Sequence, residues 1–140
     1  MTDGKTTKSA HELRYEAETG FFVFVQRGAM SAEDAQKLLV TFRDAARAGE
    51  ATFTLSDARN AGSPTPEARK IVAEAASDLG ESYLAAFGGT FATRVVQTML
   101  FKAVSILSPR YVMAVFADET EARAWLSDKR RAYLARTGKA

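Results

Sequence analysis

The stretch FFVFV at residues 21–25 decides the fold of this sequence, because every one of its positions is apolar. A strand with one face in water alternates apolar and polar residues, whereas a strand covered on both faces is apolar throughout. We therefore expect residues 21–25 to form an inner strand with helices packed on both sides. Upstream, residues 12–17 alternate apolar and charged side chains, which predicts a strand with one wet face near the sheet edge. The turn between the two strands is expected at residues 18–20.

Downstream of this strand, helices and strands alternate to the end of the chain. Each expected helix starts at a polar residue that can cap free backbone N–H groups: Ser31, Thr65, Thr90 and Asp118. Further strands are expected at residues 52–57, 82–87 and 111–116. The β-β-α-β-α-β-α-β-α order predicts an α/β fold with a mixed sheet of about five strands. An N-terminal antiparallel hairpin would be followed by parallel strands joined by right-handed crossovers.

Length and composition exclude several classes of protein. With 140 residues there is room for one hydrophobic core, which we place at residues 11–137, after a disordered lead at residues 1–10. The chain has 46% hydrophobic and 26% charged residues, the balance of a soluble globular protein. It has no cysteine, which excludes disulfides and thiolate chemistry, and its single histidine, His11, is expected to face solvent. We therefore expect no metal and no cofactor.

Charge and hydropathy argue against two kinds of partner. The 19 Lys and Arg residues exceed the 17 Asp and Glu residues by two, and this small excess raises the sequence pI to about 9.0. A pI of this origin does not indicate a nucleic-acid surface. The longest apolar segment, residues 91–107, is interrupted by charged and polar residues and is shorter than the roughly 20 residues of a membrane span. We expect no nucleic acid and no membrane span, and a cytoplasmic location, because the polar N-terminus lacks a signal peptide.

The helix expected at residues 91–107 carries the most suggestive surface. At 100° per residue, one broad apolar face is expected against the sheet: Ala92, Val95, Val96, Met99, Leu100, Ala103, Ile106 and Leu107. The opposite face is polar, yet three apolar residues project within or beside it. This mixture predicts a surface for a partner or ligand made of Phe91, Arg94, Gln97, Phe101 and Val104. The alternative is that the last helix or the loop at residues 108–110 covers these side chains.

Three short segments, together with the order of the elements, carry a resemblance to a known family. They are SPTPEAR at residues 63–69, GGTFATR at residues 88–94 and ETEARAWL at residues 119–126. From Glu12 to Leu126 the chain resembles the STAS or SpoIIAA-like superfamily (anti-sigma factor antagonist, SEC14-like), in its small stand-alone bacterial version. The resemblance implies a protein that is not an enzyme and that binds a partner of the anti-sigma factor or sensor-kinase type. Some members of the superfamily bind small ligands instead.

The same resemblance singles out the turn before the second helix. In the better-known members a serine in an Asp-Ser-Ser-Gly-like turn at this place is phosphorylated. The matching turn here, Asn60 to Thr65, lacks the Asp-Ser pair, and only Ser63 and Thr65 offer hydroxyl groups at the right place. Asn60, Ser63 and Thr65 are therefore candidates for a phosphorylation or docking turn. The alternative is a turn serine followed by a capping threonine.

Three functions remain open at this point. The favoured one is a regulatory module that binds a partner protein through the start of the second helix and the exposed side of the third. The second is a SEC14-like carrier or sensor of a small apolar ligand or lipid. Its third helix would act as a lid, with Phe91, Met99, Phe101 and Val104 lining the pocket. An enzyme acting around Asp57 is the least supported, because no nucleophile–base pair can be recognised.

Overall fold

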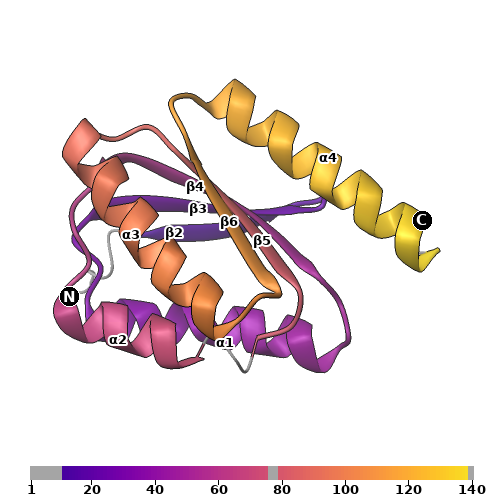
Figure 1. The fold of residues 1–140 in the computed structure, drawn as a ribbon, viewed down its shortest axis with the longest axis horizontal. Helices are drawn as coiled ribbons and strands as arrows, with labels where there is room; N and C mark the ends of the chain where they lie inside the picture. The colour runs from indigo at the N-terminus through magenta and orange to yellow at the C-terminus, as the bar shows by residue number, and fades with distance from the viewer. Residues whose placement is uncertain (1–10, 76–78, 139–140) are drawn as a thin grey trace, which may run out of the picture.

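A five-stranded mixed sheet forms the middle layer of the protein in the computed structural model, which describes residues 11–75 and 79–138 (Figure 1). The lead expected at residues 1–10 lies outside these ranges. Within them, the elements follow the expected order. They are β2 (Glu12–Glu16), β3 (Phe21–Gly28), α1 (Ala32–Arg47), β4 (Thr52–Ala61), α2 (Pro66–Ala75), β5 (Ser82–Phe87), α3 (Phe91–Leu107), β6 (Tyr111–Phe116) and α4 (Glu119–Thr137).

The strands lie side by side in sequence order, β2-β3-β4-β5-β6. β2 pairs with β3 in an antiparallel hairpin, and β3 to β6 are parallel to one another. The α/β class, the hairpin and the mixed five-stranded sheet are therefore confirmed. Residues 21–25 lie in the inner strand β3, as their uninterrupted apolar sequence predicts.

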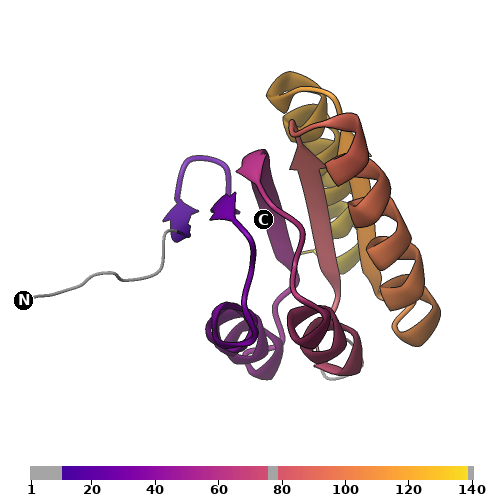
Figure 2. The same cartoon turned by 90° about the vertical axis from the view of Figure 1, so that its left-hand side faces the viewer.

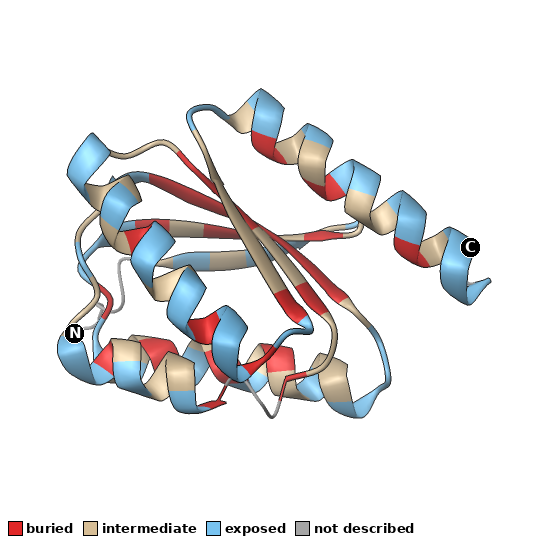
Figure 3. Cartoon of the chain, viewed as in Figure 1, coloured by how far each residue is buried: buried red, intermediate tan, exposed pale blue. Residues whose placement is uncertain are grey.

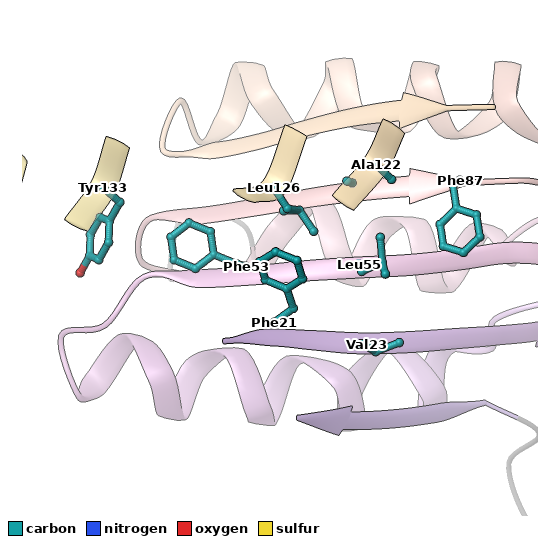
Figure 4. Close-up of a cluster of buried hydrophobic side chains, with 9 residues drawn as sticks. Phe21, Val23, Phe53, Leu55, Phe87, Ala122, Leu126 and Tyr133 are labelled. Carbon is teal, nitrogen blue, oxygen red and sulfur yellow. The ribbon is translucent and has the colours of Figure 1, made fainter. Parts of the chain in front are cut away.

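The two faces of the sheet are covered by different helices. α4 packs on one face, where its Ala122, Leu126 and Tyr133 join a core from β3, β4 and β5 (Figure 4). The ring of Phe53 stacks on Tyr83 with the two ring centres 5.2 Å apart, and Tyr133 meets Phe53 edge-on at 5.7 Å. These aromatic pairs close the core beneath α4.

The other face carries α1, α2 and α3. Figure 2 shows α1 and α2 side by side, seen nearly end-on. Leu39 and Phe42 of α1 pack with Ala75 of α2 and Val104 of α3 against the sheet. Phe22 and Phe24 of β3 also belong to this side, whereas Phe21 and Val23 face α4. The alternation of side chains along one strand thus supplies both cores.

Local capping signals place the helix starts. Ser31 and Asp34 form the reciprocal capping box of α1: the Asp34 N–H donates to Ser31 Oγ at 3.1 Å, and the Ser31 N–H donates to Asp34 Oδ2 at 3.0 Å. Thr90 and Asp118 cap α3 and α4 through the same kind of bond. These starts are confirmed because capping depends only on neighbouring residues.

β4 is four residues longer than its predicted range, 52–57. Its last residues, Asn60 and Ala61, pair with Arg27 and Gly28 of β3, after an irregularity in the register between Val25 and Arg27. The Gly62 N–H then donates to the carbonyl oxygen of Gly28 at 2.8 Å. Asn60 therefore lies in a strand, and its expected place in the turn is corrected. Backbone pairing with β3, which no local pattern reveals, extends the strand.

His11 is buried where the sequence predicts a solvent-facing side chain. Only 7% of its side chain is exposed, and its ring packs on Phe24 with centres 5.7 Å apart. Nδ1 accepts from the Arg27 N–H at 3.1 Å, and Nε2 lies 3.2 Å from Asp34 Oδ2. The residue joins β2, β3 and α1, so its role in the structure is to hold the hairpin against the first helix.

The described part of the chain contains four helices, α1 to α4. None of the helices there combines the length and the apolar character that crossing a bilayer requires.

Candidate functional site

The orientation of α3 decides where a functional site can lie. Gln97 and Val104 are its two buried residues, whereas Phe91, Met99 and Ile106 have exposed fractions of 75%, 66% and 80% (Figure 3). The predicted orientation is therefore wrong: Val95, Met99, Ile106 and Leu107 face away from the sheet. Apolar residues of α3 itself occur on more than one of its sides, so hydrophobic periodicity alone does not select the side that packs on the sheet.

An apolar strip runs along the outer side of α3. We call it the outer α3 strip, and it consists of Phe91, Val95, Met99, Ile106 and Leu107, all exposed. These are five of the seven exposed large hydrophobic side chains in the described part of the chain. Val95, Met99 and Ile106 recur at helical spacing and form its central line.

A cavity of about 90 Å³ lies on the opposite, inner side of α3. α3, α2 and the sheet enclose it, and most of its wall is apolar. The wall includes Phe24, Leu84, Met113, Ala68, Val72, Val96, Leu100, Phe101 and Val104. Gly62, Ser63 and Pro64 of the turn that precedes α2 also line the cavity, and Ser63 is exposed.

Gln97 brings a polar group to this apolar wall. The residue is 9% exposed, and its Oε1 atom is buried without a hydrogen-bond partner. A buried acceptor without a hydrogen bond lowers the stability of the fold by about 1–3 kcal/mol. A ligand or a water molecule that donates a hydrogen bond to it would remove this cost. The sequence analysis named Gln97 for the partner or ligand surface but placed it on the solvated side of the helix, because its burial depends on the rotation of α3.

The residues predicted for the site divide into two groups. Gln97, Phe101 and Val104 line the cavity with Ser63, whereas Phe91 lies on the outer strip. Met99, expected in the ligand pocket with Phe91, also faces outward, so that part of the expected pocket lining is corrected. Arg94 lies at the start of α3 and donates from Nη1 to the carbonyl oxygen of Gly89 at 3.3 Å.

Thr65 caps α2, as predicted. The Ala68 N–H donates to Thr65 Oγ1 at 3.1 Å, and the Thr65 N–H donates to the carbonyl oxygen of Met30 at 3.0 Å. Its hydroxyl group is thus engaged within the fold. Ser63, two residues earlier, is exposed.

Charged side chains at the ends of the strands form ion pairs. At the carboxyl end of β4, Arg59 Nη2 lies 2.7 Å from Asp57 Oδ2, and its guanidinium lies 5.5 Å from the centre of the Phe87 ring. Hydrogen bonds from Arg59 hold the pKa of Asp57 below its ordinary value. Asp57 therefore remains an ionised carboxylate paired with Arg59. A general base, by contrast, would need a pKa close to neutral.

Two further ion pairs join α4 to the sheet. Arg123 hydrogen-bonds Glu16 at 2.8 and 3.1 Å, and with a further bond from Thr19 this lowers the pKa of Glu16 to about 2. Glu81 accepts from Tyr83 and Arg136; burial raises its pKa, but these bonds prevail and hold the pKa below its ordinary value. Burial and the bond to Glu81 raise the pKa of Tyr83 to about 12. These groups keep their ordinary charge states at neutral pH and stabilise the fold.

Across residues 11–75 and 79–138, no three His, Cys, Asp or Glu side chains converge closely enough to hold an ion. The polar side chains of the cavity wall carry amide and hydroxyl groups, together with the guanidinium of Arg69.

Comparison with known proteins identifies the fold. No family model matches the sequence, and no curated protein matches it. An uncharacterized DUF3478-family protein of Shewanella loihica PV-4 with a SpoIIAA-like fold is similar in structure. It has a TM-score of 0.57 and 18% identity, over 84% of this chain and 92% of that one. The anti-sigma factor antagonist SpoIIAA in its unphosphorylated form is also similar, with a TM-score of 0.52 and 16% identity, over 87% of this chain and 98% of that one. The chain therefore has the STAS or SpoIIAA-like fold that the sequence segments resemble.

Proposed function

We propose that this SpoIIAA-like domain is a non-enzymatic regulatory module of bacterial signalling, which binds a partner protein in the cytoplasm. The partner would be of the anti-sigma factor or sensor-kinase type. The observation that carries the proposal is the outer α3 strip. One of the structural neighbours is an anti-sigma factor antagonist, which supports this class of function.

The strip has the properties of a docking surface. Its side chains are large, apolar and exposed along one helix, and apolar surface that stays in water costs solubility unless a partner covers it. Lys102 lies among them at helical spacing, and Arg94 lies toward one edge. A partner helix with an apolar face and acidic flanks would complement this surface.

The turn before α2 would form the second part of the docking surface. Asn60, Ser63 and Thr65 lie close together in the chain, and Ser63 and Thr93 of α3 line the same cavity, so the turn and α3 are neighbours. A phosphate on Ser63 would be favoured by the N-terminus of α2 and would add about −1.5 to −2 charge at this turn. Ser63 is the preferred acceptor, because the Thr65 hydroxyl already caps the helix.

The ion pairs support a role without catalysis. Asp57, Glu16 and Glu81 all have pKa values below their ordinary ones, because each accepts hydrogen bonds from an arginine. Catalytic acids and bases are shifted toward neutral pH instead. Asp57, Glu16 and Glu81 are therefore arranged as structural ion pairs.

Ile106→Asp tests the docking proposal. The wild-type protein and the variant are each immobilised and incubated with a cell lysate. The proteins retained from the lysate are identified by mass spectrometry. Wild type should retain an anti-sigma factor or a sensor kinase, and Ile106→Asp should lose it, because a buried carboxylate in an apolar interface is costly. Ser105→Asp is the matched control, since it places the same charge one residue away, off the strip. Equal retention by Ile106→Asp and wild type would remove α3 from the proposal.

A second function, as a carrier or sensor of a small apolar ligand, is favoured by the cavity beneath α3. Its volume of about 90 Å³ is below the roughly 150 Å³ of an engineered cavity that holds benzene. A whole lipid chain does not fit this space, so the ligand would be small. Movement of α3 as a lid would be needed for anything larger.

A further inference from the structure

The cavity combines an apolar wall with one unpartnered carboxamide. Gln97 lies on the inner side of α3 with Val96 and Leu100, and it lines the cavity together with Phe24 and Met113. Its Oε1 is buried without a partner, and neither end of the carboxamide bonds to another residue in the described part of the chain. A void and an unsatisfied group at the same place point to a ligand that supplies both shape and a hydrogen bond.

The chemistry of the carboxamide selects the ligand group. An amide offers one acceptor and one donor end, and a hydroxyl group can bind either end, because it both donates and accepts. A charged group is disfavoured at Gln97, since the surrounding wall is mainly apolar and its one charged residue, Arg69, belongs to α2 and not to α3. The body of the ligand must be apolar to match Leu100, Phe101 and Val104.

We infer that this cavity binds a small, uncharged apolar molecule with one hydroxyl group, a short-chain alcohol or a phenol, which hydrogen-bonds Gln97. The inference rests on the second of the two functions proposed above and names its ligand class. The cavity is too small to enclose a whole ring, so a phenol would keep part of its ring outside the cavity.

Phenol and benzene form the test pair, because they differ only in the hydroxyl group. Their dissociation constants are measured by following methyl NMR signals of Val104 and Met113 during titration. The same titrations are made with Gln97→Leu, which replaces the amide with an apolar side chain of similar size. Gln36→Leu on the exposed side of α1 is the matched control.

In the wild-type protein and in Gln36→Leu, phenol should bind more tightly than benzene. In Gln97→Leu, the ratio of the two constants should fall about tenfold, the loss of one hydrogen bond. An unchanged ratio would overturn the assignment of Gln97. Failure of both compounds to bind, with an ordered water bridging Gln97 in a high-resolution structure, would overturn the ligand site itself.

These outcomes are separate from those of the docking experiment. Ile106→Asp lies on the outer side of α3 and should leave phenol binding unchanged. Loss of phenol binding in Ile106→Asp would show that the signal does not report the inner cavity, and would overturn the inference. Neither result alters the partner-capture prediction.

Discussion

α3 and α4 are helices of similar length, 17 and 19 residues, that pack on the same sheet in opposite ways. α4 buries Ala122, Leu126 and Tyr133 and turns its charged residues to solvent. α3 buries a carboxamide at Gln97 and exposes Phe91, Met99 and Ile106. The apolar side chains that α4 buries stabilise the folded state. The apolar side chains on the outer side of α3 stay exposed to water.

The surroundings of α4 complete its attachment. Arg123 bonds Glu16 at the edge strand β2 and Glu119 on its own helix, and Trp125 packs against Phe116 with ring centres 5.8 Å apart. Under α3, by contrast, there is a cavity and an unpaired acceptor. The difference teaches that α4 is tightly anchored to the sheet, whereas α3 leaves apolar side chains exposed on one side and a cavity on the other.

The largest expected effect compares one leucine from each helix. Leu126→Ala removes a side chain with an exposed fraction of 0% and should lower the free energy of unfolding by about 2–4 kcal/mol. Leu107→Ala, at 55% exposure, should change it by less than about 0.5 kcal/mol. Urea unfolding followed by circular dichroism measures both. Equal losses would show that the outer side of α3 also contributes to the core.

The next effect concerns the ion pair that holds α4 to β2. Because Arg123 lowers the pKa of Glu16 to about 2 from 4.5, the pair stabilises the fold above pH 4.5 and loses this contribution as the pH falls toward 2. Glu16→Gln should therefore cost about 1–2 kcal/mol at pH 7, the range for a charged hydrogen-bonded pair that is partly exposed. The cost should vanish near pH 2 in unfolding curves recorded across this range. Glu18→Gln, at an exposed position in the neighbouring turn, serves as the control and should change the free energy of unfolding at pH 7 by less than about 0.5 kcal/mol.

The smallest effect has the opposite sign. Gln97→Leu removes an unsatisfied buried amide and should raise the free energy of unfolding by about 0.5–1.5 kcal/mol. Gln36→Leu should change it by less than about 0.5 kcal/mol, since Gln36 is exposed. Thermal and urea unfolding of the ligand-free proteins measure the difference. A clear loss of stability in Gln97→Leu would mean that the carboxamide already has a partner, and α3 would then resemble α4.

Local sequence signals predicted most of the element boundaries. The capping residues Ser31, Thr65 and Thr90 marked helix starts, and the ranges 82–87 and 111–116 are the observed strands β5 and β6. Caps and apolar runs depend on residues that are neighbours in the chain, so they can be predicted without knowledge of the tertiary fold. Residues whose environment comes from distant segments were misplaced, as with His11 between β3 and α1.

The sequence by itself determined the class, the order of the elements and the inner position of β3, because uninterrupted apolar stretches and helix caps act locally. Only the tertiary structure decided how α3 is rotated, and with it the positions of Gln97, Met99 and Ile106. A helix with apolar residues on every side has no unique packing face of its own. The neighbouring helix α2 and the sheet, including β6, select that face. They therefore decide which side chains of α3 line the cavity and which form the outer α3 strip.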